Sequence, residues 1–243
     1  FLIFSLLTIF IFYFTFYNII VPAEDALINF NHASSLANRG IFTYGNVDFK
    51  IEGSVDLLWI LYLAFFSKLG LNEYTTALIT TLFSFCGILY LLLEKCYQVK
   101  LKDRQIFSIL FFSFFCIFFT PYIWSGIVGF SSIVFTFIFL LILRNIHNEN
   151  SKSFWIFCLI ICLISPDGTV WITGPILIRL FFFREIFFKE FKNSLIFFAV
   201  PGLICFLSRW YYFGNFFPLH FFVKLSGTRD FLCLFFTDSI INS

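Results

Sequence analysis

Residues 105 to 143 read QIFSILFFSFFCIFFTPYIWSGIVGFSSIVFTFIFLLIL, a run of 39 residues without a charged side chain. A helix that spans a bilayer needs about 20 predominantly apolar residues, so this run is long enough for two passes. Pro121 and the pair Ser125-Gly126 supply a turn between the two passes. The run predicts an all-α, polytopic membrane protein.

The composition of the whole chain agrees with this prediction. Only 12% of the 243 residues are charged, 60% are hydrophobic, 43 are phenylalanine, and the mean hydropathy is +0.94. Soluble domains are about 25% charged, so this composition excludes a water-soluble domain, a disordered tail and a nucleic-acid-binding protein. The chain begins with Phe1 inside an apolar run and contains no methionine, so we expect residues 1–243 to be one transmembrane domain truncated at both ends.

The seven cysteines predict packing and not redox or metal chemistry. Five of them lie in apolar runs, and no CxxC pair occurs. Cys158 and Cys162 are four residues apart and share a helix face, but no histidine or carboxylate lies near enough to complete a zinc set. We therefore predict no metal site and no cofactor, while a need for a divalent metal in catalysis is left open.

The positions of the charged residues divide the chain into spans, because each central charge in a spanning helix costs kilocalories. Cytoplasmic loops are enriched in Lys and Arg, so the three most basic connections, at 94–104, 144–152 and 179–192, are expected inside. Residues 22–73 then lie wholly outside, and the apolar run Leu57 to Leu71 is a helix that rests on or dips into the outer leaflet. This topology predicts seven spans, at 1–21, 74–93, 105–120, 127–143, 153–165, 169–183 and 194–213.

The outer segments of this topology collect the polar residues of interest. Glu24 and Asp25 directly follow the first predicted span. They are either a solvated loop start or the N-cap of a helix whose first turn begins at Ala26, where carboxylates are common, or they form a general base or electrostatic stabiliser at the membrane surface. Asp167 stands between Pro166 and Gly168 behind a short predicted span, so we expect it in a water-filled recess.

Four segments of the chain, in order, resemble a known family. They are Glu24-Asp25-Ala26-Leu27-Ile28-Asn29-Phe30 with Gly40, Tyr44 and Asn46; Glu52-Gly53 with Trp59; Ser165-Pro166-Asp167-Gly168; and Arg209-Trp210-Tyr211-Tyr212-Phe213-Gly214 with Pro218 and Lys224. This order is similar to that of the polyprenyl-phosphate-dependent glycosyltransferases of the GT-C superfamily, in particular the arabinofuranosyltransferase-like bacterial branch. The charge-based topology also puts all four segments on one side of the membrane, as the resemblance requires.

The chain departs from the family pattern at several positions. Asn31-His32-Ala33-Ser34-Ser35 stands where the family loop carries basic residues, and Val128 stands where the family has an acid. Val55-Asp56-Leu57 and Leu219-His220 also differ from the pattern. These departures concern the groups that would select the donor.

The resemblance implies an integral membrane glycosyltransferase that moves a sugar from a polyprenyl-phosphate donor to a glycan, lipid or protein acceptor. The active site would face outward from the bacterial cytoplasmic membrane. Asp25 matches the family aspartate and is the first candidate for the base that takes the acceptor proton, with Glu24 second. Adjacent carboxylates repel each other, which tends to raise the pKa of one of two such groups.

Five further residues are candidates for substrate binding. Arg209 and Lys224 are candidates for the donor phosphate, with snorkelling or interfacial anchoring as the alternative. Asp167 either binds acceptor hydroxyls, pairs with Arg209 or caps the following helix, and Glu52 either orders its loop or touches the acceptor. His220, like His32, is a polar surface group in the plain interpretation and a substrate or catalytic contact in the other.

Two other functions fit the same sequence. A polytopic protein with a charged recess can be a transporter or a lipid flippase, although the chain shows no inverted repeat and carries a long acidic outer loop that transport does not need. An inactive or truncated relative of the transferases is the third interpretation.

Overall fold

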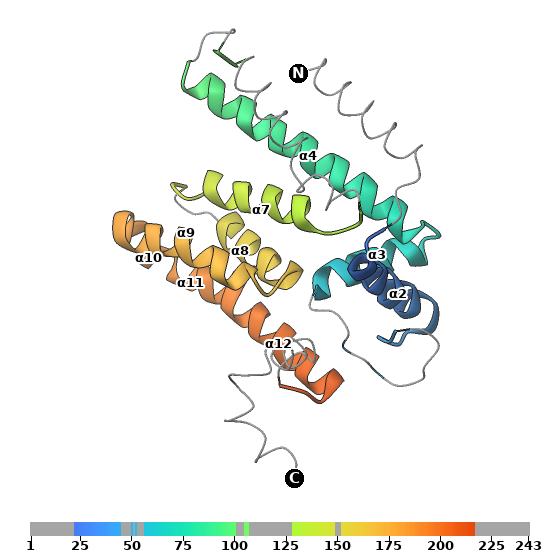
Figure 1. Ribbon diagram of the computed structural model, residues 1–243. Coiled ribbons are helices and arrows are strands. Elements are labelled where there is room, and N and C mark those ends of the chain that lie inside the picture. Colours follow the sequence, from blue (N-terminus) through green and yellow to red (C-terminus); the bar gives the residue numbers. More distant parts are fainter. Residues whose placement is uncertain are drawn as a thin grey trace, which may run out of the picture.

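The computed structural model describes residues 22–44, 50, 52, 56–100, 105–106, 128–148 and 152–216. Every regular element in these ranges is helical (Figure 1), which confirms the all-α prediction for the described part of the chain. The elements are α2 (Glu24–Arg39), α3 (Leu57–Lys68), α4 (Glu73–Gln98), α7 (Ser132–Arg144), α8 (Lys152–Ile164), α9 (Gly168–Phe182), α10 (Arg184–Lys189), α11 (Phe191–Ser194), the π-helix η1 (Leu195–Ala199) and α12 (Val200–Phe213).

Two helices in the described ranges are long and apolar enough to cross a membrane. They are α4, with 26 residues, and the continuous helix Phe191–Phe213, with 23 residues, which joins α11, η1 and α12. The apolar helices α7, α8 and α9 have 13 to 15 residues. At 1.5 Å per residue they reach about 20–22 Å, less than the roughly 30 Å of a hydrocarbon core.

The prediction of seven spans is therefore not confirmed. The predicted spans 74–93 and 194–213 coincide with the two long helices. The predicted spans 127–143, 153–165 and 169–183 coincide with helices that are short, because a turn or a charged residue ends each of them. The predicted span 1–21 and nearly all of 105–120 lie outside the described residues.

Helix α2 lies in a region that the sequence indicated mainly as an outer loop. Glu24 and Asp25 occupy its first turn and Arg39 its last turn, which matches the polarity of the helix dipole. Gly40 ends the helix in the left-handed conformation, with φ 69°, and its N–H donates to the carbonyl of Leu36. A helix was one of the alternatives for Glu24 and Asp25, but it begins at Glu24, with Ala23 at the N-cap, two residues before the predicted first turn at Ala26. Its buried face packs on α3, an apolar helix that begins at Leu57 as predicted and ends at Lys68, three residues before Leu71.

The connections between helices gather at two ends of the molecule. At one end Arg144, which closes α7, pairs with Glu94 near the close of α4 at 2.8 Å. Arg179, near the close of α9, contacts the 145–148 turn and Glu190 at the same end. The described parts of the three basic connections that the sequence grouped together are thus joined by direct contacts at one end of the fold.

The opposite end carries α2, α3 and the last turn of α12 (Figure 1). The N–H of Ala23, just before α2, donates to the carbonyl of Val128 just before α7, at 3.2 Å. The N–H of Phe42, just after α2, donates to the hydroxyl of Tyr212 at 3.1 Å. Two of the segments that the charge pattern placed outside, residues 22–44 and 209–216, therefore meet at one end of the fold.

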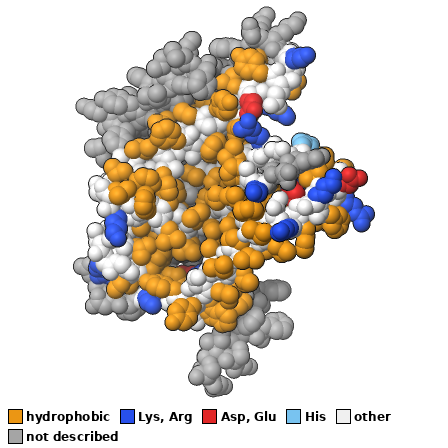
Figure 2. Space-filling view, turned by 180° about the vertical axis from the view of Figure 1, so that it is seen from behind, with side chains coloured by type: hydrophobic (Ala, Val, Ile, Leu, Met, Phe, Trp, Pro, Cys, Tyr) orange, Lys and Arg blue, Asp and Glu red, His pale blue; other side chains and the backbone are white. Residues whose placement is uncertain are grey.

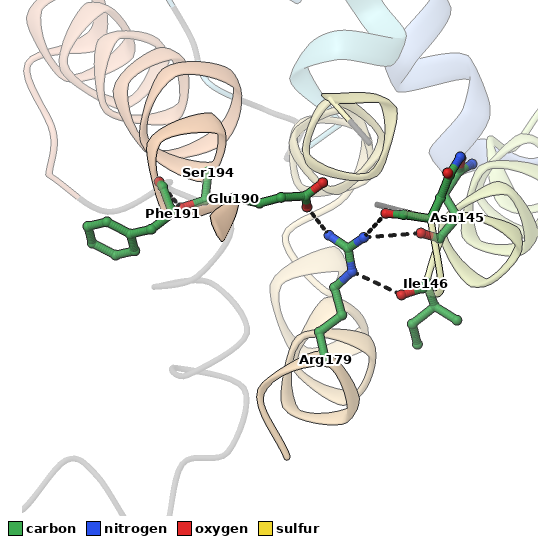
Figure 3. A network of polar contacts seen from close by, with 7 residues as sticks. Asn145, Ile146, Arg179, Glu190, Phe191 and Ser194 are labelled. Atoms are coloured by element: carbon green, nitrogen blue, oxygen red, sulfur yellow. Dashed lines mark hydrogen bonds and ion pairs between the residues drawn. The ribbon is translucent and has the colours of Figure 1, made fainter. Parts of the chain in front are cut away.

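Arg179 is a fully buried cation in this helical assembly (Figure 3). Its guanidinium pairs with Glu190 and donates to the carbonyls of Ile146 at 3.0 Å and Asn148 at 2.7 Å. It also lies over the ring of Phe154, 4.2 Å from the ring centroid. Because carbonyls at the end of a helix carry partial negative charge, Arg179 stabilises the end of α7 as well as neutralising Glu190.

The helix Phe191–Phe213 contains a π-turn with a local cause. Pro201 stands in the first turn of α12, directly after η1, and a proline inside a helix removes an N–H donor and crowds the preceding turn. A widened turn accommodates both effects, and such π-bulges are frequent at functional sites.

Figure 2 shows a broad hydrophobic surface across the back of the molecule, with most charged side chains toward its edges.

Candidate functional site

A groove of about 430 Å³ lies between α8, the turn before α9 and the η1–α12 helix, and it holds two of the sequence-predicted site residues. Its walls are mostly apolar, and Glu52 and Arg209 supply its charges. The lining residues are Glu52, Leu57, Leu159, Cys162, Leu163, Pro166, Thr169, Phe198, Ala199, Gly202, Cys205, Phe206, Arg209 and Phe216. The η1 π-turn contributes Phe198 and Ala199, so the irregular part of the helix forms one wall of the groove.

Gly202 keeps the middle of the groove open. A Cβ atom at this position would meet Cδ1 of Leu159 at 3.5 Å, which is ordinary van der Waals contact. A larger side chain at Gly202 would therefore extend into the space between α12 and α8. A substitution at Gly202 can therefore block the groove without changing its charged residues.

The polar end of the groove is a bidentate ion pair between Arg209 and Glu52. The Nε and Nη2 groups of Arg209 donate to the two carboxylate oxygens of Glu52, the second at 2.7 Å. The Nη1 group of Arg209 donates to the carbonyl of Phe216 at 2.9 Å. The side chains of Arg209 and Glu52 are only 11% and 6% exposed, so the pair is largely removed from water and its geometry is well fixed.

Phe42 and Lys50, which precede Glu52 in the chain, make three further contacts with α12. The hydroxyl of Tyr212 accepts the N–H of Phe42, and the ring of Phe42 packs edge-on against Phe213 at 5.3 Å. The Nζ atom of Lys50 lies 4.1 Å from the centroid of the Tyr212 ring. Arg209 and Tyr212 are three residues apart and so share one face of α12, which presents both to the incoming segment.

The turn at Ser165-Pro166-Asp167-Gly168 borders the groove through Pro166 and Thr169. Asp167 itself is exposed at the N-cap position of α9 and makes no side-chain capping hydrogen bond. The contacts of Arg209 go to Glu52 and Phe216, so the alternative in which Asp167 pairs with Arg209 is not seen among the described residues. Its predicted role toward an acceptor is not tested by these contacts.

Gly168 in the same turn has a steric reason to be glycine. A Cβ atom there would lie 2.4 Å from the carbonyl oxygen of Ile161 in α8. Within the turn, the N–H of Gly168 donates to the carbonyl of Ser165 at 2.9 Å. This glycine therefore sets how tightly α8 and α9 meet at the edge of the groove.

The candidate bases, Glu24 and Asp25, are exposed in the first turn of α2 and do not line the groove among its described residues. One turn later, the side-chain amide of the buried Asn29 donates to Asp56, just before α3, at 3.4 Å. The structure thus links the turn that carries Asp25 to the start of α3, whose first residue, Leu57, lines the groove. It does not bring Asp25 or Glu24 into contact with the Arg209–Glu52 pair.

His32 is a buried residue and not a polar surface group. It is 0% exposed and stacks on Phe42 at 4.9 Å, and neither ring nitrogen has a hydrogen-bond partner within normal geometry among the described residues. Burial lowers the pKa of His32 to about 4, against a smaller opposing effect of the Thr43 backbone. The imidazole is therefore neutral near pH 7 and packs in the core beneath Phe42.

The other predicted site residues, His220 and Lys224, lie outside the described residues. The described part of the chain contains no group of three or more His, Cys, Asp or Glu side chains arranged to hold a metal ion.

Sequence reasoning missed Tyr212 as an anchor for the segment that carries Glu52. The spacing of three residues between Arg209 and Tyr212 on one helix is the signal that indicates a shared face. It also missed Gly202 and the π-turn, for which Pro201 is the local signal.

No family model, curated protein or solved structure matches this chain significantly.

Proposed function

We propose that this protein is an integral membrane glycosyltransferase that takes a sugar from a polyprenyl-phosphate donor and transfers it at the outer face of a membrane. One observation of the structure supports this proposal most directly. An apolar groove of about 430 Å³ is lined by the guanidinium of Arg209, whose side chain is 11% exposed, in a segment that resembles the family. An isoprenoid chain needs apolar walls, and a phosphate needs a fixed N–H donor set at one end of them.

Arg209 retains the donors that such a phosphate needs. A guanidinium has five N–H groups, and within the described part of the chain the contacts to Glu52 and Phe216 use three of them. The two that remain belong to Nη1 and Nη2, on the side of the guanidinium that Glu52 does not cover. In the proposed complex these donors bind the phosphate, and Lys224 adds a second cation.

The proposed transfer uses the exposed carboxylates of α2. The acceptor hydroxyl oxygen attacks the anomeric carbon of the donor, and the bond from that carbon to the phosphate oxygen breaks. The hydroxyl proton passes to Asp25, with Glu24 beside it, and the electron pair of the broken bond stays on the phosphate, which leaves as polyprenyl monophosphate. The leaving phosphate ionises easily, so Arg209 supplies charge stabilisation and no general acid is needed.

One observation favours the second candidate, transport of an intact lipid phosphate. Among the described residues that line the groove, the carboxylate is that of Glu52, and it is engaged by Arg209. A groove that binds a lipid phosphate without a nearby base suits a flippase as well as a transferase.

An assay that follows both sugar transfer and lipid movement distinguishes the two proposed functions. Purified protein in vesicles receives a polyprenyl phosphate that carries a labelled sugar, with an acceptor on the outer side. A transferase releases the label to the acceptor, and a flippase moves the intact lipid between leaflets. Movement without release would overturn the transferase proposal.

The roles of the α2 carboxylates are tested by Asp25→Asn and Glu24→Gln, each of which should abolish transfer while the protein still inserts. Glu185→Gln is a matched control, because Glu185 is also an exposed carboxylate in a first helical turn but lies at the opposite end of the fold. Wild-type turnover in both α2 variants would show that neither residue is the base.

A further inference from the structure

A second groove, of about 500 Å³, lies between α4 and α7 at the end of the fold where Arg144 pairs with Glu94. Leucines of both helices and several charged or polar side chains line it. We propose that this α4–α7 groove binds an anionic phospholipid, with the lipid phosphate at Lys95 and Arg144 and an acyl chain along the leucines. The site is separate from the groove beside Arg209, so the inference does not depend on the proposed function.

The α4–α7 groove is apolar along one part and polar along the other. The apolar walls are formed by Leu91 and Leu92 of α4 and by Leu140 and Leu143 of α7. The polar side chains come later in both helices, which end close together at this point. The order from leucines to charges along both helices matches the order from acyl chain to headgroup in a phospholipid. The volume falls within the range of small-molecule sites, roughly 300–1,000 Å³.

The charges of the α4–α7 groove favour an anion. Arg144 donates to Glu94 at 2.8 Å, which fixes the guanidinium between the two helices, and its side chain is still 50% exposed. Lys95 is exposed as well, and its Nζ atom donates to Gln98 at 3.4 Å. Two cations and one carboxylate leave one excess positive charge among the described lining residues. Figure 2 shows acidic and basic side chains side by side at an edge of the broad hydrophobic surface.

The end of α7 is already neutralised from another direction. The carbonyls at the end of a helix carry partial negative charge, which would weaken the attraction of Arg144 for a phosphate. Arg179 donates to the carbonyls of Asn145, Ile146 and Asn148 in the turn that follows α7. Because Arg179 stabilises these carbonyls, the charge of Arg144 can act on a ligand in the α4–α7 groove.

Two tyrosines indicate that this part of α4 lies at the level of lipid headgroups. Tyr90 and Tyr97 are seven residues apart, so they share a helix face, and they are 53% and 65% exposed. Both line an adjoining cavity of about 610 Å³ that also borders Glu94 and Gln98. Tyrosine rings are enriched at membrane–water interfaces, where one end of the ring is apolar and the other is wet. The apolar walls and this interfacial position favour a lipid over a soluble anion, and basic pockets between spanning helices are known sites for anionic headgroups.

Lipid binding to the full chain in a neutral detergent tests this inference. Native mass spectrometry measures the dissociation constants of dioleoyl phosphatidylglycerol and dioleoyl phosphatidylcholine. The two lipids carry the same acyl chains and a phosphodiester, but the choline group cancels the negative charge of the phosphate. The wild type should bind phosphatidylglycerol about fivefold to tenfold more tightly, because each basic side chain near an anionic headgroup contributes a factor of about five. Equal affinities for the two lipids would refute the inference on the wild type alone.

Three substitutions test whether the charges of the groove cause this preference. Lys95→Gln and Arg144→Gln should each lower the affinity for phosphatidylglycerol about threefold to fivefold and leave that for phosphatidylcholine within about twofold. Glu94→Gln keeps an oxygen that accepts from Arg144 but removes the negative charge, so it should raise the affinity for phosphatidylglycerol. Loss of helix packing would not produce opposite signs. A preference that Lys95→Gln and Arg144→Gln leave unchanged, or a decrease in all three variants, would contradict the proposed site.

Cations outside the α4–α7 groove provide the matched controls. Arg184→Gln and Lys189→Gln remove exposed cations of α10 that are not among the described lining residues of this groove, and they should leave the preference unchanged. An effect as large as that of Lys95→Gln would mean that diffuse basic charge attracts the lipid, which refutes a defined site.

A further control separates this groove from the one beside Arg209. Gly202→Leu, which blocks the groove beside Arg209, should leave the preference for phosphatidylglycerol unchanged. Loss of the preference in Gly202→Leu would place the lipid beside Arg209. That result would refute the α4–α7 site and leave the proposed function standing.

Two measurements decide whether the ligand is a lipid or a free phosphodiester. Glycerophosphoglycerol, the headgroup without its acyl chains, should not displace phosphatidylglycerol at equal concentration. Leu143→Trp fills the apolar wall at a side chain that is 37% exposed, so it should weaken both lipids. Displacement by the soluble headgroup, or lipid affinities that Leu143→Trp leaves unchanged, would show that the acyl chain does not occupy the groove and would overturn the assignment to a phospholipid.

Discussion

Replacing Arg179 with methionine is expected to destabilise this protein strongly. Arg179 is 0% exposed, and its partner Glu190 has a side chain that is 3% exposed. Arg179→Met keeps a long apolar side chain over Phe154 but removes the guanidinium that pairs with the buried Glu190 carboxylate. It also removes the donor to the carbonyls of Asn145, Ile146 and Asn148.

The magnitude follows from the burial of the pair. Removing one partner of a buried ion pair typically costs about 3–5 kcal/mol, because the remaining charge stays in a poorly solvated site. For a chain of this size, about 2–4 °C of melting temperature corresponds to 1 kcal/mol, so Arg179→Met should lower the melting temperature by about 6–20 °C. The hydrogen bonds to the three carbonyls belong to the same network and are not added separately.

Arg144→Met is the matched control for this change. Arg144 pairs with Glu94 at the same end of the fold, but the two side chains are 50% and 26% exposed. An exposed pair of this kind contributes less than about 1 kcal/mol, since water and salt screen it. Arg144→Met should therefore change the melting temperature by at most a few degrees.

Thermal unfolding in detergent, followed by tryptophan fluorescence, measures both variants. A double variant, Arg179→Met with Glu190→Met, should be more stable than Arg179→Met alone, because no charge is left unpaired. Equal and small shifts for Arg179→Met and Arg144→Met would refute the reasoning, since they would mean that the guanidinium of Arg179 is not a buried structural cation.

Three further variants test the packing around the groove and beneath α2. Gly168→Ala should lower the melting temperature by several degrees, because its Cβ would meet the Ile161 carbonyl oxygen, while Gly174→Ala, with open space and a helical backbone, should raise it slightly; equal shifts would contradict the close contact. Tyr212→Phe leaves the Phe42 N–H without its acceptor and should cost about 1 kcal/mol, against no measurable change for Tyr211→Phe, whose side chain is 94% exposed. Stability should fall as the pH drops from about 6.5 to about 4, since His32 protonates at about 4 in the folded state and near 6.5 in the unfolded state; the shift corresponds to about 3 kcal/mol, and a pH slope that His32→Leu leaves unchanged would assign the effect to other groups.

The sequence predicted several elements of the fold for simple reasons. Long apolar stretches bounded by charge gave the positions of α4 and of the helix Phe191–Phe213. The distribution of Lys and Arg grouped the three basic connections that Arg144 and Arg179 join by direct contacts. Both predictions depend on hydrophobicity and charge along the chain, which are properties of local sequence.

Helix α2 shows where local signals were insufficient. Its sequence contains several Asn and Ser residues, which have low helix propensity, and only its first turn carried a helix signal. Its helical conformation is stabilised by packing of Ala26, Phe30 and Ala33 against α3. Most helical stability in proteins comes from such tertiary contacts, which a single segment does not reveal.

Some features of the candidate site could be predicted from the sequence, and others became evident only from the tertiary structure. The scarcity and cost of charges in an apolar chain singled out Asp167 and Arg209, while Glu52 was singled out by the family resemblance of Glu52-Gly53. Only the tertiary structure decided that Glu52 and Arg209, 157 residues apart, form one ion pair while Asp167 stays exposed beside their groove. It also decided that Arg179 is buried and structural although it belongs to a basic connection. Which charged residues pair depends on which helix ends lie next to each other. That arrangement is set by the packing of side chains from segments far apart in the sequence.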